Sequence, residues 1–197
     1  MYIQRTIEKS IERANKFFPV VLVTGPRQVG KTTVLQNCET QPRTYVSLDT
    51  LENRELAKND PTLFLQRYPA PVLIDEIQYA PELFPYIKAS VDKEKKNGMY
   101  WLTGSQQFHL MKNVSESLAG RVGILQLEGL SQDEKNGHPD VPPFLPTEEY
   151  IKTKVHSAAE TDLLKIYELI WKGSYPKLYP ADSDYWAVFY ESYMQTY

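Results

Sequence analysis

The segment Gly25–Thr32 reads GPRQVGKT, which is the spacing of a loop that binds phosphate groups. Glycine lets such a loop turn its backbone N–H groups toward phosphate oxygens, because it adopts conformations closed to other residues. Lys31 adds a mobile positive charge for the terminal phosphates, and the hydroxyl of Thr32 is a ligand for Mg²⁺. A chance match has odds of roughly one in a hundred or less. The motif therefore predicts binding of a nucleoside triphosphate with Mg²⁺, and ATP is the expected nucleotide.

The phosphate loop follows an apolar strand and opens a helix, whose positive dipole end favours anions. The residues expected to contact the nucleotide are Gly25, Pro26, Arg27, Gln28, Val29, Gly30, Lys31, Thr32 and Thr33. The arginine of this set can point to phosphate or to solvent, and the sequence leaves that choice open.

Two adjacent carboxylates follow a second apolar strand, Val72–Ile74. Asp75 would hold Mg²⁺ through a water, and Glu76 would orient and deprotonate the water that attacks the γ-phosphate. The pair alone is a weak signal, but it becomes a strong one 44 residues (75 minus 31) beyond the lysine of a phosphate loop. The alternatives are a surface carboxylate for Asp75 and a helix-start charge for Glu76.

Further polar residues lie near the ends of predicted strands. Thr103 ends one strand and Ser105 follows it, and a hydroxyl there can contact the attacking water or the γ-phosphate; the alternative is a small polar turn. Arg121 precedes the last strand, and an arginine brought to the γ-phosphate by closure or by a neighbouring subunit can raise the rate roughly 10³–10⁵-fold. The alternative for Arg121 is a surface salt bridge. The expected catalytic set is Lys31, Glu76, Ser105 and Arg121.

Strands and helices alternate along the first part of the chain. The expected strands are Val20–Thr24, Thr44–Leu48, Val72–Ile74, Tyr100–Thr103 and Gly123–Leu127. The expected helices are Gln4–Phe18, Lys31–Asn37, a segment opened by the cap Asp60 and by Pro61, and Glu82–Lys95. This order predicts an α/β fold: a three-layer P-loop NTPase core with a parallel five-stranded sheet, followed by a small helical C-terminal segment.

Composition is that of an ordinary globular protein, with 42% hydrophobic and 24% charged residues. A formal net charge of −3 does not suggest a nucleic-acid partner, which usually calls for a basic stripe. The single cysteine, Cys38, cannot form a disulfide within the chain, and no apolar run approaches the ~20 residues that span a bilayer. We therefore expect a cytoplasmic protein without a membrane partner.

The chain changes character after residue 130. We expect an ATPase core over residues 1–130 and, over 131–197, a linker followed by helices. Four prolines mark Ser131–Pro146 as the linker, and helical patterns resume at about Thr147–Val155 and Thr161–Lys172.

An aromatic helical face closes the chain, made of Trp186, Phe189, Tyr190, Tyr193 and Tyr197. One interpretation is that this face packs on its own domain. The other, which we expect, is that its partner is a C-terminal domain of the same protein beyond residue 197, so that the chain is a fragment.

A resemblance to a known family rests on five stretches, Gly25–Thr33 (GPRQVGKTT), Leu73–Gln78 (LIDEIQ), Leu102–Gln106 (LTGSQ), Glu116–Arg121 (ESLAGR) and Ile170–Pro176 (IWKGSYP). The chain is similar to the predicted AAA-superfamily ATPases of bacteria and archaea, in which a P-loop domain precedes a C-terminal domain of unknown function. The resemblance implies a five-stranded core whose extra strand is Thr44–Leu48. It also implies a C-terminal domain similar to restriction-type nucleases, and hence a link to DNA, which nothing in these residues shows. No clear second arginine in a helical lid is evident, which argues against assembly into a ring.

Three functions compete for this sequence. The first is an ATPase that uses hydrolysis to move attached domains, as Glu76 indicates. The second is a nucleotide-gated regulatory or interaction module with slow turnover, which the proline-rich linker and the aromatic face favour. The third, a small-molecule kinase, is disfavoured because Glu76 directly follows the metal aspartate and no arginine-bearing lid is evident. The oligomeric state and the target stay open.

Overall fold

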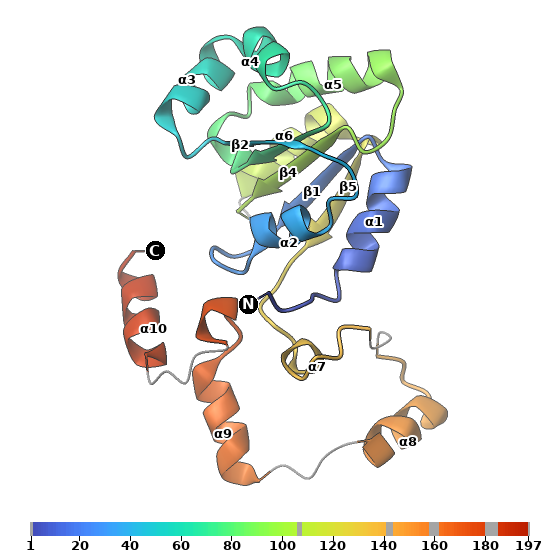
Figure 1. Cartoon of the computed structure of the whole chain (residues 1–197), viewed down its shortest axis with the longest axis vertical. Helices are drawn as coiled ribbons and strands as arrows, with labels where there is room; N and C mark the ends of the chain where they lie inside the picture. The colour runs from blue at the N-terminus through green and yellow to red at the C-terminus, as the bar shows by residue number, and fades with distance from the viewer. Residues whose placement is uncertain (1, 106–107, 141–143, 158–161, 180–184, 197) are drawn as a thin grey trace. The chain divides into compact units, whose positions relative to one another are not determined.

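The computed structural model of the chain describes residues 2–105, 108–140, 144–157, 162–179 and 185–196. The chain forms two compact units (Figure 1). One unit comprises Arg5–Glu128, and the other comprises Gly129–Tyr197 together with Met1–Gln4. The first unit thus ends two residues before the boundary expected at residue 130, and the first four residues, which we expected in the core, group with the second unit.

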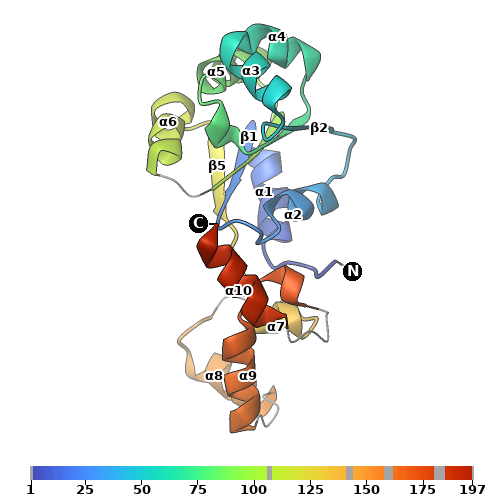
Figure 2. The same ribbon diagram turned by 90° about the vertical axis from the view of Figure 1, so that its left-hand side faces the viewer.

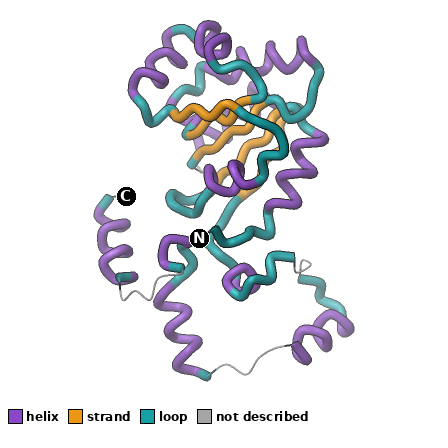
Figure 3. The backbone as a smooth tube through the Cα atoms, in the orientation of Figure 1, coloured by secondary structure: helices purple, strands orange, loops and turns teal. Residues whose placement is uncertain are grey.

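The first unit is built on a parallel sheet (Figure 3). Its five strands have the order β2-β3-β4-β1-β5. The strands are β1 (Val20–Thr24), β2 (Thr44–Ser47), β3 (Val72–Asp75), β4 (Tyr100–Gly104) and β5 (Val122–Gln126). The first residues of neighbouring strands pair with one another, so that Val20 lies opposite both Tyr100 and Val122. All the carboxyl ends therefore meet at one edge of the sheet. The predicted α/β core with a five-stranded parallel sheet is confirmed.

Helices cover both faces of this sheet (Figure 2). They are α1 (Glu8–Phe17), α2 (Lys31–Asn37), α3 (Leu51–Asn59), α4 (Pro61–Arg67), α5 (Leu83–Glu94) and α6 (Phe108–Leu118). Alternate strand residues such as Val20, Leu22 and Ile74 pack with α3 to α6 in one apolar cluster, while α1 contacts β1 and β5 and α2 contacts β4. Because both faces are covered, the central strands β1, β3 and β4 are buried along their whole length.

Two helices of this unit differ from the expectation. Helix α1 begins at Glu8 rather than at Gln4, because the Glu8 carboxylate accepts a hydrogen bond from the backbone N–H of Arg5 at 2.7 Å and holds the chain in a turn there. Helix α3 is not predicted by the sequence pattern, since most of its residues are polar and Ala57 is its buried member.

The expected start of α4 is confirmed. The side chain of Asp60 accepts a hydrogen bond from the backbone N–H of Leu63 at 2.9 Å, and Pro61 occupies the first turn. This helix and α5 pack on the side of the sheet that carries this apolar cluster.

The second unit contains short helices. They are α7 (Gln132–Lys135), α8 (Glu148–Ser157), α9 (Leu163–Lys172) and α10 (Trp186–Gln195). The prediction of a linker over Ser131–Pro146 is wrong at its start, because the Ser131 hydroxyl and the Glu134 carboxylate form a capping box that begins α7. Among the described residues, no helix is long and apolar enough to cross a bilayer.

The aromatic face of α10 has partners inside this unit. The ring of Tyr175 lies 5.2 Å from those of Phe189 and Tyr193 and 6.0 Å from that of Tyr190, measured between centroids. The rings of Trp171 and Trp186 are 5.5 Å apart. These contacts fit the interpretation in which the aromatic face packs on its own domain. The predicted member Tyr197 lies outside the described residues.

Candidate nucleotide-binding site

The loop between β1 and α2 turns through three residues with positive φ, Gly25 (147°), Gln28 (62°) and Gly30 (93°). Successive backbone units in such conformations form a concavity of N–H groups that binds anions. Gln28 lacks the conformational freedom of glycine, so its left-handed backbone costs about 1–2 kcal/mol. Strain of this kind is concentrated at functional sites.

The two glycines of the loop are required for different reasons. A Cβ at Gly25 would overlap the carbonyl oxygen of Leu127, just after β5, so close packing of backbone on backbone demands glycine there. A Cβ at Gly30 would meet no heavy atom within 4 Å. What requires glycine at that position is the positive φ, and the open space beside it suits the close approach of a phosphate group.

Lys31 is buried at the base of the loop. Its ammonium group donates hydrogen bonds to the carbonyl oxygens of Gly25 at 3.2 Å and Pro26 at 2.9 Å. The side chain therefore ties the start of the loop to the start of α2 and holds the loop in shape.

Several charges surround this ammonium group. Burial lowers the pKa of Lys31, the carboxylates of Glu76 and Asp75 act to raise it, and the positive charge of Arg27 acts to lower it. The charge of Arg27 thus acts on Lys31. This effect does not decide whether the Arg27 side chain points to phosphate or to solvent, the choice that the sequence leaves open. Two cations and two carboxylates suit a ligand that carries both signs of charge, such as a triphosphate with a divalent cation.

Asp75 is the centre of a hydrogen-bond network at the carboxyl edge of the sheet. Its Oδ1 accepts hydrogen bonds from the hydroxyls of Thr32 and Thr103, each at 2.5 Å. Its Oδ2 accepts from the hydroxyl of Tyr45 at 3.3 Å. The network joins β3 to β2, β4 and α2, so the two predicted metal ligands, Thr32 and Asp75, lie in direct contact.

The donor atoms of this pair fit Mg²⁺. They are a hydroxyl oxygen and a carboxylate oxygen, the hard ligands that this ion prefers. Mg²⁺ is usually held by one or two carboxylates together with waters and substrate phosphates rather than by a cage of protein ligands. The described residues contain no cluster of three or more His, Cys, Asp or Glu residues that could hold a metal.

Glu76 follows directly, in a strained backbone conformation. Its φ is +60°, in the left-handed region, and its backbone N–H donates to the Thr103 hydroxyl at 3.0 Å. Its carboxylate accepts a hydrogen bond from the side-chain amide of Gln78, in the 3₁₀ turn Ile77–Tyr79. The predicted water activator is therefore held from both its backbone and its side chain.

The two hydroxyls predicted at the end of β4 have different surroundings. Thr103 is fully buried, and its hydroxyl is engaged by Asp75 and by the backbone of Glu76. Ser105 is 6% exposed, and its Oγ has no hydrogen-bond partner within the described part of the chain. Of the two, Ser105 is the one whose hydroxyl has no partner among the described residues. Gln106, in the same stretch, lies outside the described residues.

Arg121 lies at the other edge of the sheet. Its carbonyl oxygen accepts from the backbone N–H of Val20, at the start of β1, whereas the phosphate loop follows the end of that strand. Its guanidinium makes two hydrogen bonds to the carboxylate of Asp92 on α5, at 2.5 and 3.0 Å, and lowers the pKa of that carboxyl group. This contact is a surface salt bridge, which is the alternative to a catalytic role that the sequence offers for Arg121. A role at a γ-phosphate would need the site of a second chain.

Two side chains of the network are absent from the sequence prediction. Tyr45 reaches Asp75 because β2 pairs with β3, which places Ser47 opposite Asp75. Burial and the charge of Asp75 both raise the pKa of Tyr45. Gln78 reaches Glu76 only because the chain turns sharply after β3. A polar residue close to the Asp-Glu pair was the available signal for Gln78, and the strand order was needed for Tyr45.

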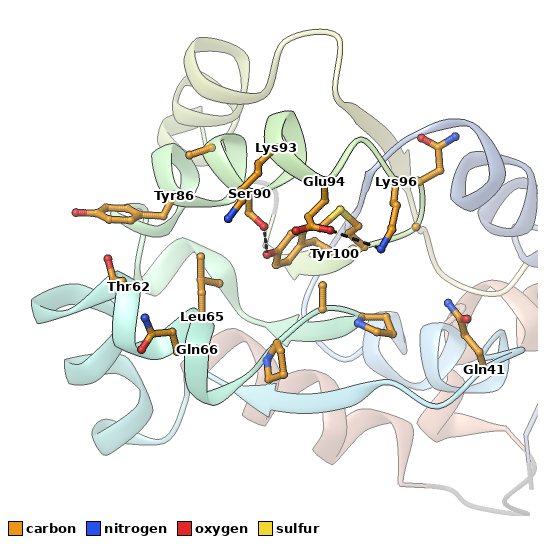
Figure 4. Close-up of a pocket in the computed structure, with 17 residues that line it drawn as sticks. Gln41, Thr62, Leu65, Gln66, Tyr86, Ser90, Lys93, Glu94, Lys96 and Tyr100 are labelled. Atoms are coloured by element: carbon orange, nitrogen blue, oxygen red, sulfur yellow. Dashed lines mark hydrogen bonds and ion pairs between the residues drawn. The ribbon is translucent and has the colours of Figure 1, made fainter.

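A hollow of about 940 Å³ lies away from this network, at the amino edge of the sheet (Figure 4). It is lined by α4, α5, the residues just before β3 and the start of β4, and the hydroxyls of Ser90 and Tyr100 share a hydrogen bond of 2.8 Å in it. None of the predicted site residues lines this hollow. The predicted chemistry is concentrated at the opposite edge.

A sequence profile described as an AAA domain matches residues 17–136, which is more than half of the chain. The chain belongs to this AAA-domain family. The match begins before the phosphate loop and continues past β5, so it includes every strand of the sheet. The suspected resemblance to AAA-superfamily ATPases is confirmed.

The chain is also similar to individual proteins. This chain is 37% identical over 130 residues to the uncharacterized proteins Mb2031c of Mycobacterium bovis and Rv2008c of Mycobacterium tuberculosis. That region is 65% of this chain and 29% of each relative, so the chain spans less than a third of the curated relatives that it matches. Its fold is similar to the Walker-type ATPase PABY2304 of Pyrococcus abyssi, with a TM-score of 0.57, 18% identity and coverage of 98% of this chain and 68% of that one.

Proposed function

We propose that this AAA domain binds ATP with Mg²⁺ and hydrolyses it. The observation that supports the proposal best is the meeting of two hydroxyls, from Thr32 and Thr103, on one carboxylate oxygen of Asp75. One hydroxyl comes from the helix that follows the phosphate loop, and the other from the strand between β1 and β3. Asp75 and Glu76 are consecutive, so this contact brings the loop of Gly25–Thr32 next to the proposed metal ligands and the proposed water activator.

In the proposed site the loop residues Gly25–Thr33 hold the phosphates, with Lys31 near the β- and γ-phosphates. Thr32 and Asp75 would hold Mg²⁺, Asp75 through a water, and the ion would neutralise phosphate charge when bound. The ammonium group of Lys31 already lies within the loop, where it donates to the carbonyl oxygens of Gly25 and Pro26.

Glu76 is proposed to orient the attacking water and take its proton. The side-chain amide of Gln78 would fix the direction of the Glu76 carboxylate. The hydroxyl of Ser105, which has no hydrogen-bond partner in the part of the chain that the structure describes, would contact the water or the γ-phosphate. Arg121 stays a proposed catalytic residue only for the site of a neighbouring chain, because its own loop is at the other edge of the sheet.

The test is magnesium-dependent ATP hydrolysis by three variants. Glu76→Gln should keep ATP binding and lose turnover by a factor of at least about 100, because a general base typically contributes 10²–10⁴. Lys31→Ala should lose ATP binding. Glu82→Gln is the matched control, since it makes the same change at an exposed glutamate six residues on (82 minus 76), and it should behave like the wild type. Unchanged turnover in Glu76→Gln would remove Glu76 from the mechanism.

A second candidate function is a nucleotide-gated module in which hydrolysis is slow and ATP changes the contacts of attached parts. The observation that favours it is the exposed apolar surface of α9, where Leu163, Leu164, Ile170 and Trp171 are each more than 60% exposed. Under this function ATP would change the assembly state of the chain while turnover stays negligible. Fast hydrolysis with no change of assembly in light scattering would exclude it. Repeating the hydrolysis and light-scattering measurements in the presence of duplex DNA tests for a DNA partner.

A further inference from the structure

Arg5 is a buried cation that the proposed mechanism does not use. It lies just before α1 and is 5% exposed. One terminal nitrogen of its guanidinium donates to the carbonyl oxygen of Val29 at 3.0 Å, and the other donates to the carbonyl oxygen of Glu128 at 2.7 Å. A single side chain thus links the phosphate loop to the residue at which the first unit ends.

The contact with Val29 acts on the loop from outside. A peptide unit is planar, and its C=O and N–H point in opposite directions when the bond is trans. Holding the carbonyl of Val29 therefore also holds the N–H of Gly30, which points away from Arg5. A charge-assisted hydrogen bond also polarises the peptide and makes that N–H a stronger donor.

The contact with Glu128 acts on the segment through which the chain leaves the sheet. The backbone N–H of Leu127 donates to the carbonyl of Thr24 at 2.8 Å, and Gly25 packs against the carbonyl of Leu127. Both ends of the loop, Gly25 directly and Val29 through Arg5, are therefore fastened to the same short segment.

On its other side that segment is fastened within the second unit. The backbone N–H of Leu130 donates to the carbonyl of Ser174 at 2.6 Å, just after α9. Only Gly129 separates Glu128, which is held by the phosphate loop through Arg5, from Leu130, which is held by the second unit.

From these contacts we infer that Arg5 is a positioning residue with two roles: it fixes the Gly30 N–H for phosphate, and it transmits occupancy of the loop to the segment Leu127–Leu130. The inference rests on the proposed function, because it requires that the loop binds ATP. The side chain of Arg5 acts through the backbone of the loop.

The experiment compares Arg5→Gln with Arg13→Gln in the 197-residue chain, with MgATP as the probe. Arg13 is an exposed arginine on α1, so its variant makes the same loss of charge outside the contact. ATP affinity should fall about tenfold in Arg5→Gln and stay unchanged in Arg13→Gln, because one charge-assisted hydrogen bond at the loop is lost. Amide hydrogen exchange at Leu127–Leu130 should slow when ATP binds to the wild type and to Arg13→Gln. In Arg5→Gln at saturating ATP, the loop should be protected and Leu127–Leu130 should not respond.

Arg5→Lys serves as the second variant, in case the glutamine variant does not fold. Its ammonium group keeps the charge but lacks the fork that reaches two carbonyls. We expect the response at Leu127–Leu130 to be lost and the affinity to fall about threefold. Wild-type affinity together with a wild-type exchange response in whichever arginine variant folds would overturn the inference and leave the proposed function intact. Absence of ATP binding in the wild-type chain would overturn the proposed function first, and the inference with it.

Discussion

The Thr103 hydroxyl joins Asp75 to the backbone of Glu76. It donates to Oδ1 of Asp75 at 2.5 Å and accepts from the N–H of Glu76 at 3.0 Å. Thr103 belongs to β4, which lies between the strand of the phosphate loop and the strand of the two carboxylates. One buried hydroxyl thus fixes the proposed metal ligand and the proposed water activator to the same neighbouring strand.

Replacing Thr103 by Val removes this hydroxyl at nearly constant volume. We expect turnover to fall about 10–100-fold, since both carboxylates lose a fixed position, while ATP affinity changes less than about threefold. The free energy of unfolding should fall by about 1–3 kcal/mol, because the Glu76 N–H is left without its partner. Steady-state hydrolysis and urea denaturation measure the two effects. Thr103→Ser keeps the hydroxyl and should retain most of the activity; full turnover in Thr103→Val would contradict the assigned role.

The two loop glycines should fail in different ways when replaced by Ala. Gly25→Ala pushes the loop against the Leu127 carbonyl and should cost more than about 2 kcal/mol of stability. Gly30→Ala meets no neighbouring atom and should cost only the ~1–2 kcal/mol of left-handed strain.

The binding measurement separates the two glycine variants further. Gly30→Ala should weaken ATP affinity at least about tenfold while the chain stays folded, because its methyl group lies in the space that suits phosphate. Thermal melting and ATP titration of both variants give the comparison. Equal losses of stability would show that close packing is not what distinguishes Gly25.

Arg121 and Asp92 form a matched pair for testing catalysis between chains. Arg121→Ala and Asp92→Ala remove the same exposed ion pair, so their melting temperatures should change little and alike. In dilute solution both should hydrolyse ATP at the wild-type rate, since the guanidinium is not at its own phosphate loop. At concentrations where chains associate, Arg121→Ala alone should be slower. A slow Arg121→Ala variant in dilute, monomeric solution would contradict the position of Arg121 in the fold.

Cys38 should report on the packing of α2. Burial, with smaller contributions from the carboxylates of Glu8 and Glu12, raises the pKa of its thiol to about 12. At pH 8 the reactive thiolate should therefore be about a thousandfold scarcer in the folded chain than in the unfolded one. Alkylation by iodoacetamide, followed by mass spectrometry with and without denaturing urea, measures this ratio. Rapid labelling of the folded chain would mean that α2 opens readily.

The raised pKa of Cys38 makes the stability of the fold depend on pH. Because the folded-state pKa is raised, folding favours the protonated thiol, and this contribution is fully present below the unfolded pKa of about 8.5. It is lost progressively as the pH rises toward 12. Cys38→Ser should remove this part of the alkaline destabilisation.

The parts of the fold that the sequence predicts well are those in which one local signal decides. The central strands are continuous apolar runs, and the loop Gly25–Thr32 has a fixed spacing of glycine, lysine and threonine. The cap at Asp60 and the proline after it mark the start of α4. Helix α3 carries no such signal, because its residues are mostly polar and it is held by its neighbours.

The parts of the site that the sequence misses depend on the arrangement of strands. Tyr45 reaches Asp75 only through the pairing of β2 with β3, and Gln78 reaches Glu76 only through the turn after β3. Arg121 illustrates a simpler rule. It precedes its strand, whereas the loop at Gly25 follows its strand, and in a parallel sheet these positions are opposite edges.

The strand order also sets the distance between β1 and β3. Because β4 separates β1 from β3, the strand that leads into the loop and the strand that carries Asp75 and Glu76 are two strand spacings apart, or about 9.5 Å. Backbone hydrogen bonds set that width, so no change of side chain can alter it. Substitutions can change which side chains reach from one strand end toward the other, as those of Thr32 and Thr103 do. The distance between the ends of β1 and β3, however, is set by the strand order.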